Sequence, residues 1–110
     1  MAGSAETRIE EGCARVALYG RIDHRSRPAF GHGIGQVLRH PQLRGIVVDL
    51  RRASALDSVT LGLILVLRDH ARQQILPFEV LSSGGELDDT LRLAGLCEAK
   101  PAACLEACAA

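Results

Sequence analysis

The strongest hydrophobic pattern of the chain lies at positions 45–74, and it has two parts of different character. The first part, Ile46–Leu50, is a short apolar run rich in β-branched side chains, which is typical of a buried strand. A polar connection, Arg51–Leu56, follows it. The second part begins after Asp57 and Ser58, is rich in leucine and continues into good helix formers. It therefore predicts a helix of about four turns that is capped by one of these two residues.

Projected at 100° per residue, this helix has a buried stripe and an outer stripe. We expect the stripe that packs on the sheet to contain Thr60, Leu63, Ile64, Leu67, Ala71 and Ile75. On the outer side, in line with Ser58, fall Leu61, Gly62 and Leu65. Apolar residues gathered at a helix N-terminus indicate a partner-binding surface. The alternative is that Asp57 or Ser58 only caps the helix and that a neighbouring element covers the leucines.

The rest of the chain alternates between the period of a strand and the period of a helix. Strands are predicted at Thr7–Glu10, Cys13–Tyr19 and Pro77–Leu81, and an edge strand at Leu96–Ala99. Helices are predicted from Pro28 to His40, from Glu86 to Ala94 and from Pro101 to Ala110. This order implies an α/β domain with a mixed sheet of about 4–5 strands and helices packed mainly on one side.

Two of these helices have a defined inner face. For the first, the inner residues are expected to be Phe30, Ile34, Val37 and Leu38. For the helix at Glu86–Ala94, they are Leu87, Leu91 and Ala94. The first helix is weakened by three glycines, which cost about 1 kcal/mol each relative to alanine: Gly31, Gly33 and Gly35.

Composition limits the classes of function. The chain has 110 residues, enough for one small domain, and 13 basic side chains balance 13 acidic ones. A chain without net charge and with few aromatic rings is a poor candidate for direct nucleic-acid binding. The sequence shows neither a signal-peptide pattern nor an apolar run of membrane-spanning length. We therefore expect a cytoplasmic protein without membrane insertion.

The reactive residue types do not form a catalytic pattern. The four cysteines, Cys13, Cys97, Cys104 and Cys108, contain no CxxC pair, so we expect buried or incidental thiols. Cys104 and Cys108 would share a helix face, but no histidine lies nearby to complete a metal site. The sequence has no glycine-rich phosphate-binding loop, and no residue that could act as a general base lies at a characteristic sequence spacing from Ser58. We interpret the chain as a non-enzyme with no cofactor and no metal.

Five segments together resemble a STAS domain, in particular a bacterial anti-sigma factor antagonist. They are Gly20-Arg21-Ile22-Asp23, Ile46-Val47-Val48-Asp49-Leu50, Leu56-Asp57-Ser58, Leu61-Gly62 and Leu91-Arg92-Leu93-Ala94-Gly95-Leu96. The resemblance covers about residues 7–99 of what we expect to be a single domain at 1–110, and it leaves an Ala/Cys-rich tail at 101–110. It implies a mixed sheet with helices on one side. One departure is Thr60, where the family usually has Gly or Ala.

The resemblance also implies a mechanism of partner switching in transcription regulation. A partner anti-sigma factor with serine-kinase activity would phosphorylate Ser58, and a serine phosphatase would reset it. The unphosphorylated protein, a monomer or weak dimer, would bind the partner and free the sigma factor. The partner-binding residues would be Asp23, Asp57, Ser58, Leu61, Gly62 and Leu65. The alternative is a STAS-type scaffold, or a subunit of a membrane transport or signalling complex, in which the same surface binds without a phospho-switch.

Overall fold

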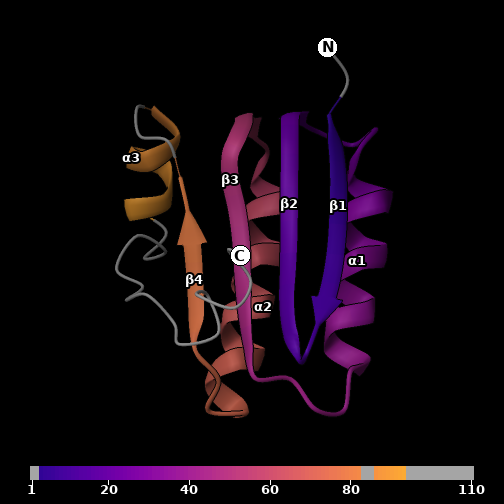
Figure 1. Cartoon of the computed structure of the whole chain (residues 1–110). Coiled ribbons are helices and arrows are strands. Elements are labelled where there is room, and N and C mark those ends of the chain that lie inside the picture. Colours follow the sequence, from indigo (N-terminus) through magenta and orange to yellow (C-terminus); the bar gives the residue numbers. More distant parts are fainter. Residues whose placement is uncertain (1–2, 83–85, 94–110) are drawn as a thin grey trace.

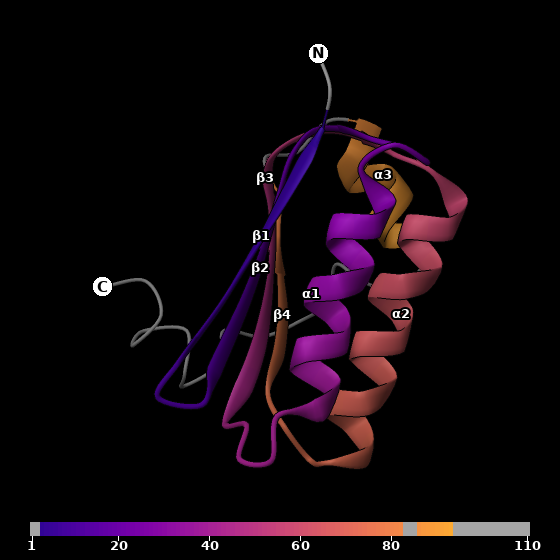
Figure 2. The same cartoon turned by 90° about the vertical axis from the view of Figure 1, so that its right-hand side faces the viewer.

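The computed structural model describes residues 3–82 and 86–93, and this part of the chain forms a 4-stranded sheet with three helices. The strands are β1 (Ser4–Glu10), β2 (Cys13–Ile22), β3 (Gly45–Leu56) and β4 (Phe78–Leu81). The helices are α1 (Arg27–Arg39), α2 (Ser58–Gln73) and α3 (Glu86–Leu93). All three helices lie on one face of the sheet (Figures 1 and 2). The predicted fold class, an α/β domain with helices on one side, is confirmed.

The sheet combines both kinds of strand pairing. Its strand order is β1-β2-β3-β4, with β1 antiparallel to β2 and the pairs β2–β3 and β3–β4 parallel. The hairpin between β1 and β2 turns at Glu11 and Gly12, both of which have positive φ, as a tight hairpin turn requires. The two parallel connections each contain a helix, α1 and then α2, because parallel neighbours need a crossover.

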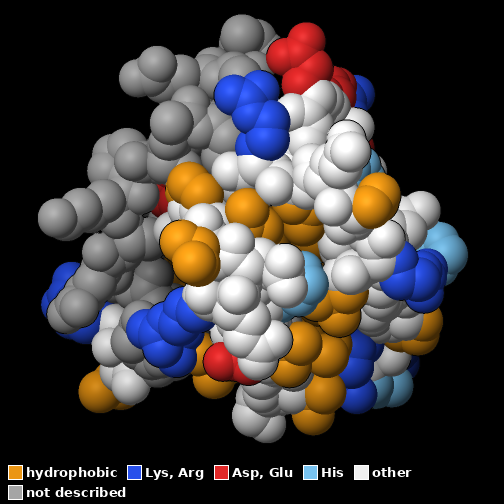
Figure 3. Space-filling model, turned by 90° about the horizontal axis from the view of Figure 1, so that it is seen from below, with side chains coloured by type: hydrophobic (Ala, Val, Ile, Leu, Met, Phe, Trp, Pro, Cys, Tyr) orange, Lys and Arg blue, Asp and Glu red, His pale blue; other side chains and the backbone are white. Residues whose placement is uncertain are grey.

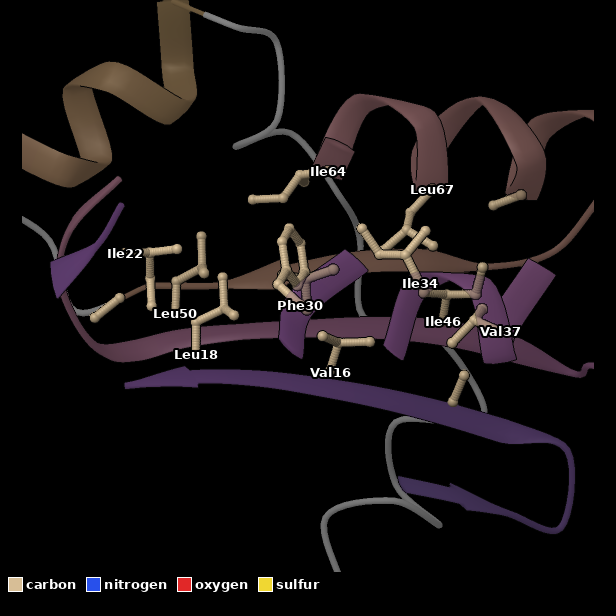
Figure 4. Close-up of a cluster of buried hydrophobic side chains, with 14 of the residues drawn as sticks. Val16, Leu18, Ile22, Phe30, Ile34, Val37, Ile46, Leu50, Ile64 and Leu67 are labelled. Atoms are coloured by element: carbon tan, nitrogen blue, oxygen red, sulfur yellow. The ribbon is translucent and has the colours of Figure 1, made fainter. Parts of the chain in front are cut away.

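The core fills the space between the sheet and the helices (Figure 4). Alternate side chains of β2 and β3 face the helices, and Val16, Leu18, Ile46 and Leu50 are completely buried. From the helices, buried side chains are contributed by Phe30, Ile34, Val37, Ile64, Leu67 and Leu91. Each such aliphatic or aromatic side chain stabilises the fold by about 1.5–3 kcal/mol. The predicted inner face of α1 is confirmed: Phe30, Ile34 and Val37 are buried, and Leu38 is half-buried against the core.

One of the α1 glycines has a packing role. A Cβ built on Gly33 would stand 2.0 Å from the Thr7 hydroxyl oxygen on β1, so only glycine lets the helix approach the strand this closely. A Cβ on Gly31, in contrast, would meet nothing within 4 Å. The helix therefore forms over Arg27–Arg39 despite the helix-weakening glycines, because tertiary packing outweighs local propensity.

Three of the four strands, β1, β2 and β3, are longer than the sequence indicated. The stretch predicted as a polar connection, Arg51–Leu56, is wrong as a loop, because it continues β3. Its backbone pairs with β2 through Tyr19↔Arg52 and Ile22↔Leu56. These pairs satisfy the backbone hydrogen bonds, so the strand does not need a continuous apolar sequence here. Strand β1 likewise begins at Ser4, three residues before the predicted start.

The end of α2 corrects the prediction for Ile75, which was placed on the buried stripe. Ile75 lies beyond the helix, has φ +54° and is 91% exposed. Its N–H donates to the Arg72 carbonyl, and the Leu76 N–H donates to the Ala71 carbonyl, which is the Schellman pattern of a helix end. At this end of the molecule, hydrophobic side chains reach the surface among basic ones and histidine (Figure 3).

Several predictions concern residues 94–110, which lie outside the described part. They are the inward Ala94, the strand Leu96–Ala99, the helix Pro101–Ala110 and the thiols of Cys97, Cys104 and Cys108. For Cys13 the expectation of a thiol is wrong, because this buried residue is disulfide-bonded. Within residues 3–82 and 86–93, none of the helices is both long and apolar enough to cross a membrane.

Candidate functional site

Two helix N-termini meet at one end of the sheet. Because β2 and β3 are parallel and pair up to Ile22↔Leu56, the segments that follow both strands emerge side by side. The Asp57 N–H donates to the Ile22 carbonyl over 3.2 Å and ties the two segments together. Helix α2 starts at Ser58 and helix α1 starts after the loop 23–26, and the two helix starts lie next to each other (Figure 2). The resulting site contains the loop that begins at Asp23 and the first turn of α2 with Ser58.

The cap of α2 is Asp57, not Ser58. The Asp57 carboxylate accepts a hydrogen bond of 2.8 Å from the Thr60 N–H, which satisfies one of the free amides at the helix start. Ser58 is the first helical residue and is exposed. Thr60, the departure from the family pattern, is completely buried and does not displace the helix start.

Asp57 is also the most strongly perturbed acid at this end of the chain. Hydrogen bonding from Thr60 is the largest of the causes that together lower the pKa of Asp57 to about 2; the ion pair with Arg27 acts in the same direction, and burial acts against both. Only the Thr60 N–H makes a hydrogen bond of normal geometry, since the hydroxyl oxygen has no partner. Arg27 is the first residue of α1, so this ion pair joins the starts of both helices.

Asp23 organises the loop that leads into α1. Its carbonyl accepts hydrogen bonds from the N–H groups of Ser26 (3.2 Å) and Arg27 (3.0 Å). Its carboxylate accepts one of 2.9 Å from the Arg25 N–H, which lowers the pKa of Asp23. Just before this loop, Gly20 has φ +72° at a register shift between β2 and β3, a conformation that favours glycine. The structure therefore brings Asp23 to the same end of the molecule as Ser58.

The outer face of α2 differs from the predicted patch. Gly62 is exposed as expected, but Leu61 and Leu65 are half-buried and pack against the core, and so does Leu63. The exposed large apolar side chains on this helix are Val59, 49% exposed, and Val66, 46% exposed. Leu61 is covered because it lies at the flank of the helix, about 90° from the centre of the buried stripe. We call the exposed residues Val59, Gly62 and Val66 the α2 patch.

A second polar cluster lies on the sheet face away from the helices. Asp49 accepts hydrogen bonds from the guanidinium groups of Arg15 (2.7 Å) and Arg51 (3.0 and 2.9 Å). Burial would raise the pKa of Asp49, but the hydrogen bonds from Arg51 and Arg15 hold it well below its usual range. These residues, with Tyr19 and Arg52, line a hollow of ≈190 Å³. In the described part of the chain, His, Cys, Asp and Glu do not gather in threes that could hold a metal ion.

Comparison with known proteins places this geometry in a family. A family model described as "Mlab, STAS domain" matches residues 5–103. The chain belongs to the STAS domain family. A STAS-domain containing protein of Pseudomonas aeruginosa (strain UCBPP-PA14) is 43% identical over 56 residues, which are 51% of this chain. The match spans 54% of that relative, about half of its length.

Solved structures with the same fold include anti-sigma factor antagonists. This STAS domain resembles the antagonist SpoIIAA in its unphosphorylated form with a TM-score of 0.72 and 17% identity, over 84% of this chain and 81% of that one. It resembles Bacillus SpoIIAA in its phosphorylated form with a TM-score of 0.69 and 17% identity, over 84% of each chain. An antagonist from Mycobacterium paratuberculosis gives a TM-score of 0.69 and 23% identity, over 98% of this chain and 93% of that one.

Two features of the site did not emerge from the sequence. The ion pair of Arg27 with Asp57 joins residues from different helices, and only the position of Arg27 beside Pro28, at a helix start, hinted at it. The exposed Val59 and Val66 could have been found, because the same 100° projection places both on the outer side of α2.

Proposed function

We propose that this STAS domain is an anti-sigma factor antagonist that binds an anti-sigma factor with serine-kinase activity and is switched off by phosphorylation of Ser58. The observation that carries the proposal is the state of Ser58: it is exposed, and the neighbouring Asp57 already provides the cap of the helix. Its hydroxyl is therefore not needed to hold α2 in place and is accessible to a kinase. A serine phosphatase would reverse the modification.

The fold tolerates a phosphate at this position. The free N–H groups and the dipole of a helix N-terminus favour an anion. In the transfer itself, the Ser58 Oγ forms a bond to the γ-phosphorus of ATP held by the partner, ADP leaves, and the hydroxyl proton passes to a base of the partner. The STAS domain supplies only the acceptor and is not itself an enzyme.

The bound partner does not tolerate the phosphate. The α2 patch begins next to Ser58 and presents Val59 and Gly62 to solvent. A partner seated on this apolar surface would have to strip water from a dianion, which is unfavourable without a compensating charge. Phosphorylation thus blocks the surface without refolding the domain. Support comes from the fold of SpoIIAA, an antagonist that has been solved in both unphosphorylated and phosphorylated forms.

The experiment that tests the proposal uses the cytoplasmic kinase-type anti-sigma factors of the organism that encodes the chain. Each purified candidate is incubated with ATP and the STAS domain, which we expect to act as a monomer or weak dimer, and the phosphorylated residue is identified by mass spectrometry. We expect one candidate to bind the chain and to modify Ser58, and to leave the Ser58→Ala variant unmodified. Modification elsewhere, or none by any candidate, would overturn the proposal.

A second candidate function is a STAS-type subunit of a membrane transport or signalling complex. The observation that favours it is that the cap and the Arg27–Asp57 ion pair form the site independently of Ser58. In this case the α2 patch binds constitutively, and co-purification recovers membrane subunits instead of a kinase.

A further inference from the structure

The side chain of Arg27 lies beside the residue that precedes Ser58. It comes from the first position of α1 and forms an ion pair with Asp57, and both side chains are 30% exposed. Two backbone contacts fix its place: the Arg27 N–H donates to the Asp23 carbonyl, and the Asp57 N–H donates to the Ile22 carbonyl. These hydrogen bonds hold the first residue of α1, and with it the Arg27 guanidinium group, next to the start of α2.

Two buried polar groups of Arg27 and Thr60 have no hydrogen-bond partner in the described structure. The Nε–H of Arg27 is buried and has no hydrogen-bond acceptor. The hydroxyl of the completely buried Thr60 is also without a hydrogen-bond partner. A buried donor without an acceptor is unfavourable, so the Arg27 guanidinium, which pairs with the residue before Ser58, has capacity for a further acceptor at the start of α2.

We propose that Arg27 is the counter-ion of the phosphate on Ser58 and exchanges its bond to Asp57 for bonds to the phosphate. This inference rests on the proposed phosphorylation of Ser58. A phosphate monoester carries up to two negative charges and three acceptor oxygens, whereas the Asp57 carboxylate carries one charge. The planar fork of a guanidinium matches phosphate in a bidentate manner, so the dianion is the stronger competitor.

The exchange has a structural consequence. Asp57 keeps its hydrogen bond from the Thr60 N–H, so α2 remains capped while Arg27 turns. Since the backbone of Arg27 is anchored to Asp23, the phosphate becomes linked to the loop that starts α1. The phosphate is then held over the start of the α2 patch in a fixed position instead of moving freely in solvent.

The test uses phosphoserine placed at position 58 by genetic encoding, so it needs no kinase. The pKa of the second phosphate ionisation is measured by ³¹P NMR, and a free phosphoserine titrates near about 6. We expect this phosphate pKa to be lower in the wild type than in Arg27→Gln by at least about 0.5. The expected difference is small because solvent screens the charge of a partly exposed arginine. We also expect the Arg27 Nε–H resonance to shift on phosphorylation.

The matched control is Arg39→Gln, which removes the same charge at the far end of α1 and should titrate like the wild type. The other charged groups at the site, Asp23, His24, Arg25 and Asp57, are common to all variants. Arg27→Lys keeps a charge opposite Asp57 without the fork, provides the comparison if the Gln variant fails to fold, and should give an intermediate pKa. Equal values in the wild type and the Arg27 variants would overturn the inference. Because the phosphate is encoded, this failure is distinct from the absence of a kinase.

Discussion

Asp57 is the residue whose replacement most directly tests the geometry of the site. It caps α2 through the Thr60 N–H and pairs with Arg27. Loss of an Asp cap costs about 1 kcal/mol, and a partly exposed ion pair contributes at most about 1 kcal/mol. We therefore expect Asp57→Ala to lower the free energy of unfolding by about 1–2 kcal/mol. For a domain of this size that corresponds to a decrease in Tm of about 4 °C or more.

The two contributions can be separated by a second variant. Asparagine is as good a cap as aspartate but carries no charge, so Asp57→Asn should lose only the ion pair and be destabilised by less than about 1 kcal/mol. Urea unfolding monitored by circular dichroism gives all values. The control is Asp69→Ala, which removes an exposed acid from the middle of the same helix and should change the free energy by less than about 0.5 kcal/mol. If Asp57→Ala is as stable as Asp69→Ala, the capping geometry is wrong.

Three further predictions follow from the described contacts. The folded-state pKa of Asp57 is lowered from 3.8 to about 2, so its charge stabilises the fold above about pH 4. The difference in unfolding free energy between wild type and Asp57→Asn should therefore disappear as the pH falls from about 4 to about 2. A difference that stays constant over this range would contradict the prediction. Ile75→Gly should raise the free energy of unfolding by about 0.5–1 kcal/mol, because Ile75 is 91% exposed and has a left-handed backbone conformation with φ +54°. An unchanged urea midpoint would show that the backbone at Ile75 is not strained. Val66→Asp should leave Tm nearly unchanged, whereas Leu67→Asp should abolish folding because it buries an unpaired charge. Similar Tm values for the two variants would contradict the orientation of α2.

Much of the fold could be predicted because the hydrophobic period is strong where it matters. The buried run Ile46–Leu50 and the leucine-rich run after Ser58 predicted β3 and α2, and the pair Asp57 and Ser58 predicted the helix start without deciding which of the two is the cap. The hydrophobic pattern fails to predict an element where backbone pairing, and not burial, determines its length. Arg51–Leu56 is polar and yet continues β3, because its hydrogen bonds are satisfied by β2. Ile75 fits the helical stripe, but the helix has ended before it.

The site could be predicted only in its local part. The positions of Ser58, Asp57 and Gly62 follow from one helix, so a projection of the sequence was sufficient. The ion pair of Arg27 depends on the parallel register of β2 and β3, which no local pattern reveals. The projection places Leu61 at the flank of the helix, and only the neighbouring elements decide that its side chain packs against the core.

The central claim is that a negative charge at Ser58 controls partner binding without changing the fold. The measurement that tests it most directly is the Kd of the kinase-type anti-sigma factor for three proteins: wild type, Ser58→Ala and Ser58→Asp. As a control, Ser54→Asp adds the same charge at an exposed position of β3. We predict that Ser58→Ala and Ser54→Asp bind like the wild type, since Asp57 keeps α2 capped. Ser58→Asp should bind about 5–150-fold more weakly at an unchanged Tm. Equal Kd values for Ser58→Asp and the wild type would contradict the claim.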